Sequence, residues 1–388
     1  MKIAIFSDSY HPSIDGVVTQ INNMAREFTE MGHEVLVVAP AHSSKFEEHK
    51  KGKLKELLLP SISLPTYKDY RISMAHSPRV LKELRKFKPD IIHIQTPFSV
   101  GWQGLRYGKK LRVPVIGTYH TLIPEFLMYI PIPFLRHIGF AKYLTWKYSA
   151  HFYNKCDVVT TPTQKMKAEL EKNGIRGVVV LSNAIDFDKF YSAGKKRGRV
   201  KSSKKSKPFK LIYFGRISFE KNIEVILFAL RHLLVKKMDV SLTITGDGPA
   251  LKSLKETAKE IGIQKYVEFT GKMTGEKLAK TVAEHDALVT ASTIETQGLT
   301  ILEAMAAGVP CIGANYLAIP DAISYGKNGF LFRPFDFGDL ALQVEKLASS
   351  AALRKKLGEN ALKTAQNFRS EKIVEETLRI YKRAIKLS

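Results

Sequence analysis

Cysteine and long apolar runs are scarce in this sequence of 388 residues, which contains two cysteines. Cys156 and Cys311 fall in different predicted domains within apolar surroundings, which favours reduced core thiols over a disulfide or a zinc site. No run of 18 or more apolar residues occurs, and the first residues lead straight into a predicted strand. We therefore expect a cytoplasmic protein with neither a transmembrane helix nor a signal peptide.

Two common motifs are also missing. The loop after the first predicted strand lacks G-x-G-x-x-G, so the sequence does not support a dinucleotide site. No D-x-D occurs in a suitable strand-end loop, and metal-ligating residues do not cluster. We therefore predict no metal and no cofactor.

Acidic residues are outnumbered, 37 against 61 Lys and Arg, for a net charge of +24. An excess this large suggests a polyanionic partner such as nucleic acid, an anionic membrane surface or an anionic substrate. A Lys-rich solvated surface would give the same composition. The segment 192–208 contains eight of the basic residues and no acid. It predicts an irregular linker or loop, which could bind anionic lipid or nucleic acid or be a plain solvated insertion.

Strand and helix patterns alternate in both halves of the chain. Residues 2–6, 17–31 and 33–40 predict a βαβ unit, and further strands follow at 91–95, 115–119 and 158–161. A second alternating pattern begins after residue 207. The sequence thus predicts an α/β protein with two parallel αβα sandwiches. The predicted domains are 1–185 and 209–370, separated by a hinge and basic linker at 186–208.

The most informative stretch is 286–321. It predicts a buried strand at 287–291, a polar loop ending at Gly298, and a helix over 302–307. The amides of Gln297, Gly298 and Leu299 would then lie at a helix N-terminus, where they can hold a phosphate. Glu295 and Glu303 bracket that position, and carboxylates bind hydroxyl pairs. A nucleotide sugar needs both kinds of contact, although either glutamate could instead be a solvated surface acid.

Arg216 and Lys221 lie five residues apart across a predicted strand-to-helix loop. Such a pair can straddle a diphosphate, with Arg as a fork and Lys as a compact charge. As ordinary surface residues they would carry no functional meaning.

The E-x7-E spacing inside ETQGLTILEAMAAGVP, followed by AIPD, resembles the donor site of glycosyltransferase family 4, retaining enzymes of GT-B architecture. The resemblance spans essentially the whole chain and is strongest from 210 to 334. It implies two Rossmann-like domains facing across a cleft, with a C-terminal helix at 371–388 that crosses back to the N-terminal, acceptor-binding domain. It also implies that Arg216 and Lys221 stabilise the leaving nucleoside diphosphate and that Glu295 binds the sugar.

Weaker parts of the resemblance suggest further residues. TGDGP resembles a G-x-G-P turn that brings Gly246 to the nucleotide, and FTGKM resembles the segment that covers the base, which includes Lys272. The first loop usually contains a glycine pair in this family. Here it has Asp15 and Gly16, so only Gly16 corresponds. NAIDFDKF departs in the same way, with Ala184 in place of glycine.

TYHTLIPEF resembles the acceptor-side segment of lipid-glycosylating members of the family, which implies roles for His120 and Glu125. After Glu125 no acid occurs until Asp157. The intervening segment contains the apolar run LMYIPIPF. If 134–155 is helical, one stripe of it contains Arg136, Phe140, Leu144, Lys147, His151 and Lys155. This pattern indicates either an interfacial membrane contact or a core helix with snorkelling cations.

The sequence therefore predicts a retaining, metal-independent hexosyltransferase that uses a nucleoside-diphosphate sugar, with UDP-glucose as a first guess. The resemblance implies front-face attack, with the leaving phosphate taking the proton of the acceptor. We expect a membrane lipid such as diacylglycerol as acceptor, at the inner face of the cell membrane, and we do not expect nucleic acid. The alternatives are a soluble sugar, sugar-phosphate or polysaccharide acceptor, or a non-catalytic polyanion-binding protein on the same scaffold.

Overall fold

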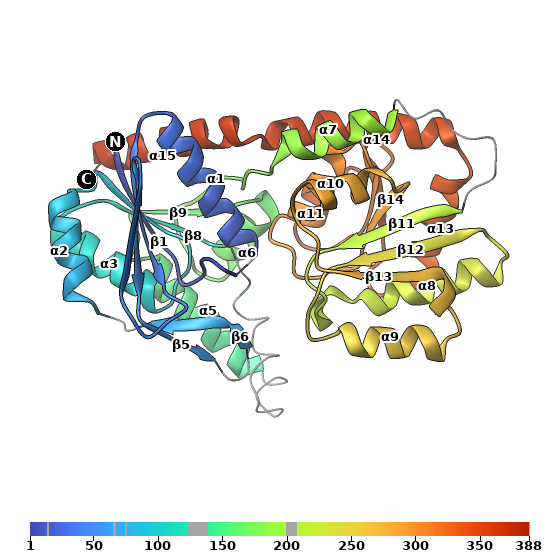
Figure 1. The fold of residues 1–388 in the computed structure, drawn as a ribbon, viewed down its shortest axis with the longest axis horizontal. Helices are drawn as coiled ribbons and strands as arrows, with labels where there is room; N and C mark the ends of the chain where they lie inside the picture. Colours follow the sequence, from blue (N-terminus) through green and yellow to red (C-terminus); the bar gives the residue numbers. More distant parts are fainter. Residues whose placement is uncertain are drawn as a thin grey trace. The chain divides into compact units, whose positions relative to one another are not determined.

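The computed structural model describes residues 1–13, 15–64, 67–73, 76–120, 122, 139–198 and 208–387. They form two compact units, which we call unit 1 (Met1–Ala184 and Ser370–Ser388) and unit 2 (Ile185–Arg369) (Figure 1). Glu125, the apolar run before residue 135, Arg136 and the basic residues 199–207 lie outside the described residues, so the predictions made for them stay open.

Unit 1 contains an eight-stranded sheet in the order β10-β9-β8-β7-β1-β2-β4-β3. All neighbours in it are parallel except β3 and β4, which pair antiparallel. The central strands are apolar on both faces, as parallel strands covered by helices require. A short antiparallel pair, β5 and β6, follows β4. The bounds are β1 Lys2–Phe6, β2 Glu34–Pro40, β3 Glu47–Lys51, β4 Leu54–Leu59, β5 Ser61–Leu64, β6 Tyr67–Ser73, β7 Ile91–Ile94, β8 Val115–Thr118, β9 Val158–Thr161 and β10 Val178–Val180.

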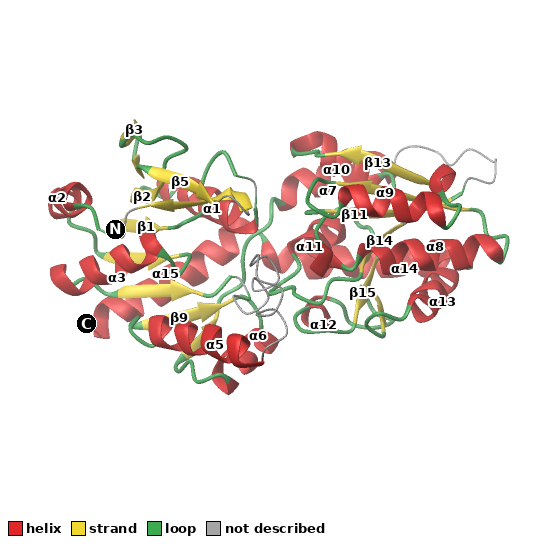
Figure 2. Cartoon of the chain, turned by 90° about the horizontal axis from the view of Figure 1, so that it is seen from below, coloured by secondary structure: helices red, strands yellow, loops and turns green. Residues whose placement is uncertain are grey.

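Helices cover both faces of this sheet (Figure 2). One face packs on α1, which begins at an Asp15 N-cap and buries Ile21, Met24 and Phe28, and on α15, whose Tyr381 ring lies 5.8 Å from that of Phe28. On the other face, Gly104 of α3 lies directly over Phe6. The helices are α1 Gly16–Glu30, α2 Pro78–Phe87, α3 Ser99–Leu111, α5 Gly139–Tyr153, α6 Gln164–Lys172 and α15 Ser370–Leu387.

Unit 2 contains a six-stranded, fully parallel sheet in the order β13-β12-β11-β14-β15-β16. One continuous apolar core joins the sheet to its helices. The strands are β11 Phe209–Phe214, β12 Val240–Thr245, β13 Val267–Gly271, β14 Ala287–Thr290, β15 Cys311–Ala314 and β16 Gly329–Phe332. The helices are α7 Phe187–Gly198, α8 Ile223–Val235, α9 Leu251–Glu260, α10 Gly275–Ala283, α11 Leu299–Ala306, α12 Ile319–Ala322, α13 Phe337–Ala348 and α14 Ala351–Ala365, with 3-10 turns η2 Phe219–Lys221, η3 Gln264–Tyr266 and η4 Gln366–Phe368.

Helix α7 corrects the prediction for the basic linker. The first part of the predicted irregular segment is helical as far as Gly198 and belongs to unit 2. Phe187 and Phe190 enter the core of that unit, and a Cβ added at Gly194 would lie 2.3 Å from the Ala307 carbonyl oxygen. The segment was misread because the apolar residues that fix the helix precede the basic run.

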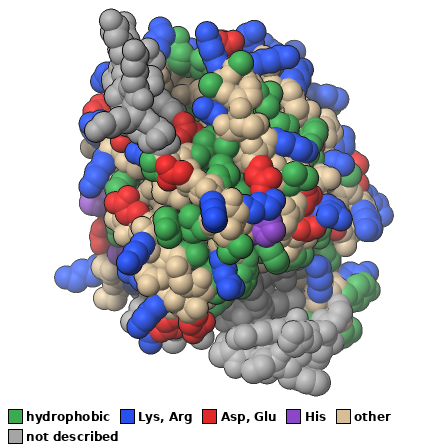
Figure 3. Space-filling view, turned by 90° about the vertical axis from the view of Figure 1, so that its right-hand side faces the viewer, with side chains coloured by type: hydrophobic (Ala, Val, Ile, Leu, Met, Phe, Trp, Pro, Cys, Tyr) green, Lys and Arg blue, Asp and Glu red, His purple; other side chains and the backbone are tan. Residues whose placement is uncertain are grey.

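The surface of unit 2 bears on the question of a polyanionic partner. On the face seen in Figure 3, Lys and Arg side chains are dispersed among acidic and apolar ones and do not form one stripe.

None of the helices in the described part of the chain combines the length and apolar composition needed to span a bilayer.

Candidate functional site

The connection between β14 and α11 forms the centre of the candidate donor site. Gly298 ends this loop with φ at +79°, a conformation that favours glycine, and starts α11. The helix begins at Leu299, three residues before the predicted start, so the amides of Leu299 and Thr300 form its first turn. The N-cap residue Gly298 has no side chain with which to cap this end. The predicted helix N-terminus therefore exists, and Gln297 beside it is buried.

Lys221 and Glu295 form an ion pair beside this helix end. Lys221 Nζ lies 2.6 Å from Glu295 Oε1, and the side chains are 18% and 19% exposed. Burial alone would raise the pKa of the Glu295 carboxyl. The charge and hydrogen bond of Lys221, with a hydrogen bond from Ser292, hold this pKa below its ordinary value. The Glu295 carboxyl is thus ionised and paired with Lys221 at neutral pH.

Asn222 joins the two loops that contribute this pair. It adopts a left-handed conformation with φ at +50° between η2 and α8. Its Nδ2 lies 3.2 Å from the Ala291 carbonyl oxygen and 3.2 Å from Thr293 Oγ1. The β11–α8 and β14–α11 connections are therefore fastened together. The sequence analysis missed Asn222, although an asparagine directly before an apolar helix is a recognisable turn signal.

Arg216 lies in the same β11–α8 connection as Lys221. It is half-buried, and its carbonyl oxygen accepts a hydrogen bond from the Tyr213 hydroxyl at 2.7 Å. The two predicted cations thus follow the carboxyl end of β11, next to β14 in the sheet. Parallel sheets place their ligands at this edge.

Glu303 has a different environment from Glu295. It is half-buried one turn into α11, on the side of α7. Burial raises the pKa of its carboxyl to about 8, the nearby Asp186 charge adds to the rise, and Lys189 opposes it. Of the two predicted carboxylates, one is therefore paired and ionised in the free protein, and the other holds its proton near neutral pH.

Gly246 and Lys272 lie at the same edge, after β12 and β13. Gly246 has φ at +150°, and a Cβ there would lie 1.9 Å from the Gly215 carbonyl oxygen. The close approach of the loops that contain Gly246 and Gly215 is therefore enough to require glycine at position 246. The sequence prediction had explained this glycine by contact with the nucleotide. Lys272 is exposed directly after Gly271, whose carbonyl oxygen accepts from the Gly246 amide.

The other predicted residues belong to unit 1. Gly16 is exposed at the start of α1, but the Asp15 carboxylate already caps this end by accepting from the Val18 amide at 2.8 Å. An anion at Gly16 would meet that carboxylate. His120 follows β8, and its Nε2 lies 2.6 Å from Oε1 of Gln95. Burial lowers the pKa of His120 to about 4, so the ring is neutral at pH 7.

Asp8 lies at the carboxyl edge of the sheet in unit 1, and the sequence analysis did not single it out. Its carboxylate is buried after β1 and accepts from Thr96 Oγ1, Ser99 Oγ and the Val100 amide. Burial raises the pKa of Asp8, while these hydrogen bonds oppose the rise. A carboxylate between a strand and the first turn of α3 fixes the loop that contains Gln95.

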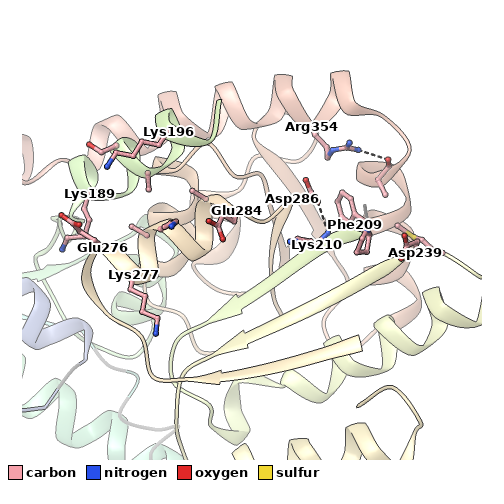
Figure 4. Close-up of a pocket in the computed structure, with 18 of the residues that line it drawn as sticks. Lys189, Lys196, Phe209, Lys210, Asp239, Glu276, Lys277, Glu284, Asp286 and Arg354 are labelled. Atoms are coloured by element: carbon pink, nitrogen blue, oxygen red, sulfur yellow. Dashed lines mark hydrogen bonds between the residues drawn. The ribbon is translucent and has the colours of Figure 1, made fainter. Parts of the chain in front are cut away.

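A pocket in unit 2 lies away from these residues. Its lining includes the start of β11, the residues before β12 and β14, and parts of α7 and α10, so it opens at the amino edge of the sheet (Figure 4). Both charge signs occur there, with Lys189, Lys196 and Lys277 among the cations and Glu276 and Glu284 among the acids. None of the predicted site residues lines it.

Comparisons with known proteins agree with this architecture. Residues 14–189 match the family described as Glycosyltransferase Family 4, and residues 194–364 match Glycosyl transferases group 1. The chain is 31% identical over 346 residues to the alpha-monoglucosyldiacylglycerol synthase of Streptococcus pneumoniae, covering 86% of this chain and 75% of that one. It is 30% identical over 341 residues to a GDP-mannose-dependent alpha-mannosyltransferase of Corynebacterium glutamicum, covering 87% and 78%. Among solved structures, Anabaena HepE in complex with UDP superposes with a TM-score of 0.74 at 19% identity, covering 98% of this chain and 100% of that one.

Two α/β units built on mainly parallel sheets, together with these matches, define a glycosyltransferase of the GT-B fold. More narrowly, the chain belongs to glycosyltransferase family 4 and is a hexosyltransferase. The fold and the family that the sequence predicted are both confirmed.

Proposed function

We propose that the chain transfers a hexose from a nucleoside-diphosphate sugar to a hydroxyl of a membrane lipid, with retention and without a metal ion. The observation that supports the donor most directly is the Lys221–Glu295 pair beside the N-terminus of α11. Lys221, Arg216 and the helix amides place positive charge where a diphosphate would leave. Glu295 offers a carboxylate to the sugar hydroxyls, and Glu303 offers a carboxyl group to the ribose hydroxyls.

The donor and the metal requirement can be tested together. Incubation with a panel of nucleotide sugars and a total-lipid extract should release nucleoside diphosphate, and an excess of EDTA should leave the rate unchanged. The cations of the chain would supply the charge stabilisation that a metal supplies elsewhere. Activity that is lost in EDTA and restored by magnesium or manganese would contradict the metal-independent mechanism.

The ion pair leads to a prediction about nucleotide affinity. Glu295→Gln should bind UDP several-fold more tightly than the parent, because the diphosphate then no longer competes with a carboxylate for Lys221. The same variant should transfer sugar more slowly. Isothermal titration with UDP measures the first effect and product formation the second.

Glu220→Gln is the matched control, since Glu220 lies in the same loop but bonds to Ser218 Oγ at 2.6 Å. Its UDP affinity should stay near that of the parent. Weaker UDP binding by Glu295→Gln would mean that Glu295 and the diphosphate do not share Lys221.

The lipid acceptor is supported by the outer surface of α5. Phe140, Tyr143 and Leu144 are 64%, 53% and 49% exposed, and Lys147 Nζ lies 5.3 Å from the centre of the Tyr143 ring. The opposite side of the helix is buried through Trp146, Phe152 and other residues. Exposed apolar side chains beside cations are typical of an interfacial contact. His151 is exposed too, but Lys155 lies beyond the end of the helix, so the predicted stripe stops before it.

A membrane contact of this kind predicts salt-sensitive vesicle binding. The protein should pellet with vesicles that contain anionic lipid, stay soluble with zwitterionic ones, and be released by high salt. Lys142→Ser/Lys147→Ser should weaken binding roughly 30-fold, since each surface cation contributes about 1 kcal/mol. Phe140→Ser/Leu144→Ser should weaken it as well.

Lys109→Ser/Lys110→Ser removes the same charge from exposed positions at the end of α3 and should bind almost as the parent does. If both double lysine variants lost vesicle binding equally, the binding would depend on the net charge of the protein and not on the surface of α5. Transfer to soluble sugars by a protein that ignores vesicles would favour the soluble acceptor.

A further inference from the structure

Asn222 links the β11–α8 connection to the β14–α11 connection through its side-chain amide. Its Nδ2 donates to the Ala291 carbonyl oxygen and to Thr293 Oγ1, both at 3.2 Å. It also lies 3.3 Å from the Glu220 carbonyl oxygen within its own connection. Because Lys221 is the preceding residue, the link lies directly beside the cation that pairs with Glu295.

The two ends of the β11–α8 connection are held differently. At its start, the Ile217 amide donates to the Asp247 carbonyl oxygen at 2.9 Å, so a backbone contact holds it to the β12–α9 connection. At its end, side chains make the corresponding contacts to the β14–α11 connection. These contacts are the Lys221–Glu295 ion pair and the hydrogen bonds of the Asn222 amide.

The ion pair becomes weaker as a link once a diphosphate is bound. A diphosphate competes with the Glu295 carboxylate for Lys221 Nζ, since both are anionic acceptors for the same cation. The Asn222 amide donates instead to the Ala291 backbone carbonyl oxygen, which is not a ligand for phosphate. The Asn222 link therefore persists while the donor occupies the site.

Backbone conformation alone does not explain an asparagine at position 222. Its φ of +50° lies in the left-handed region, which glycine adopts freely and asparagine tolerates. Glycine would make the same turn, but it would leave Ala291 and Thr293 without the Nδ2 contacts. The asparagine is therefore better explained by what its amide does for the neighbouring connection.

We propose that Asn222 is the positioning residue of Lys221, which it holds opposite Glu295 by fixing the β11–α8 connection to the β14–α11 connection. The inference rests on the proposed function, in which Lys221 stabilises the leaving diphosphate. A displacement of about 1 Å in a group that contacts the reacting atoms can lower a rate by about 10²-fold. Loss of the link should therefore be visible in turnover.

Kinetics in two backgrounds test whether Asn222 acts through Lys221. Asn222→Gly removes the amide, keeps the backbone conformation, and should lower kcat by about 10-fold or more with an unchanged circular dichroism spectrum. Asn222→Asp, which keeps the size of the side chain but lacks the Nδ2 hydrogens, should have the same effect. In a Lys221→Ala background, Asn222→Gly should lower kcat by no more than about 2-fold, because the group that it positions is gone.

The ion pair can also be followed without any substrate. In ¹³C-labelled protein, with Glu295→Gln to assign the signal, the Glu295 carboxyl should titrate below its ordinary range, because Lys221 holds its pKa down despite burial. Asn222→Gly should raise this pKa, since a displaced Lys221 opposes the effect of burial less. An unchanged titration in Asn222→Gly would overturn the proposal.

Lys237→Gly is the matched control. Lys237 is exposed just after the other end of α8 and has φ at +59°, so the substitution introduces glycine into the same conformation of the same unit. Its kcat and its Glu295 titration should stay near those of the parent.

Two further outcomes have a clear meaning. If Asn222→Gly lowers kcat equally with and without Lys221, or leaves kcat unchanged relative to folded protein, Asn222 does not position Lys221 and the inference is refuted. If no donor supports turnover in the parent, the proposed function fails, while the Glu295 titration still decides the role of Asn222.

Discussion

Arg216→Ala and Lys221→Ala should each lower kcat by about 10²-fold or more while the protein stays folded. Both side chains occupy the β11–α8 connection beside the N-terminus of α11, where a diphosphate would acquire charge as the glycosidic bond breaks. A charged contact that strengthens in the transition state is worth roughly this factor. Initial rates with a saturating nucleotide sugar, and circular dichroism for the fold, measure the two outcomes.

Lys236→Ala serves as the matched control, because Lys236 is an exposed cation of the same unit at the opposite edge of the sheet. Its removal should change the rate by only a few-fold. Rates near the parent value for both Arg216→Ala and Lys221→Ala would refute the assignment of the donor site.

Glu303→Gln should make the protein more stable and less active at pH 8. The pKa of Glu303 is raised to about 8 in the folded protein, so between its ordinary value near 4.5 and pH 8 the unfolded chain loses a proton that the folded chain keeps. Stability of the parent is therefore lost as pH rises through this window. Glutamine removes that dependence, and the gain at pH 8 should be on the order of 2 kcal/mol after allowance for partial exposure.

Urea unfolding at pH 5 and pH 8, with turnover measured in parallel, tests the prediction. The gain should be small at pH 5 and larger at pH 8, while the rate falls because the carboxyl group that binds hydroxyls is gone. Glu295→Gln should change stability in the opposite direction. Lys221 holds the pKa of Glu295 below its ordinary value despite burial, so removal of this carboxylate should destabilise the protein above pH 4.5. A Glu303→Gln variant that unfolds more easily at pH 8 would mean that Glu303 is paired as a carboxylate.

The donor loop could be predicted from sequence because its signals are local. A buried strand, a polar turn, Gly298 and a run of helix formers determine a helix N-terminus without reference to distant residues. The same holds for the first βαβ unit, where the Asp15 cap and the apolar stripe of α1 follow from a few adjacent positions.

Features that depend on neighbours distant in sequence could not be predicted in the same way. The Gln95–His120 contact requires β7 to pair with β8. The raised pKa of Glu303 depends first on its burial and then on the charge of Asp186, which precedes another helix. Helix α7 was mistaken for a linker because the prediction gave more weight to the basic residues of this segment than to Phe187 and Phe190 at its start. The strands β3 to β6 were not anticipated either, since β3 and β4 are short and partly exposed.

The packing of α15 bears on the order in which the chain can fold during synthesis. Most of unit 1 is made before unit 2, yet its core includes Val374, Leu378 and Tyr381 from α15, which follows unit 2. The Tyr381 hydroxyl lies 2.7 Å from the buried His93 Nδ1. Unit 2 is continuous, so a ribosome releases all of it before α15 has emerged. The N-terminal unit therefore waits with an open apolar face while the later unit completes its core, the reverse of the usual order. Nascent chains stalled before residue 370 should accordingly recruit chaperones through α1 and the adjoining sheet face.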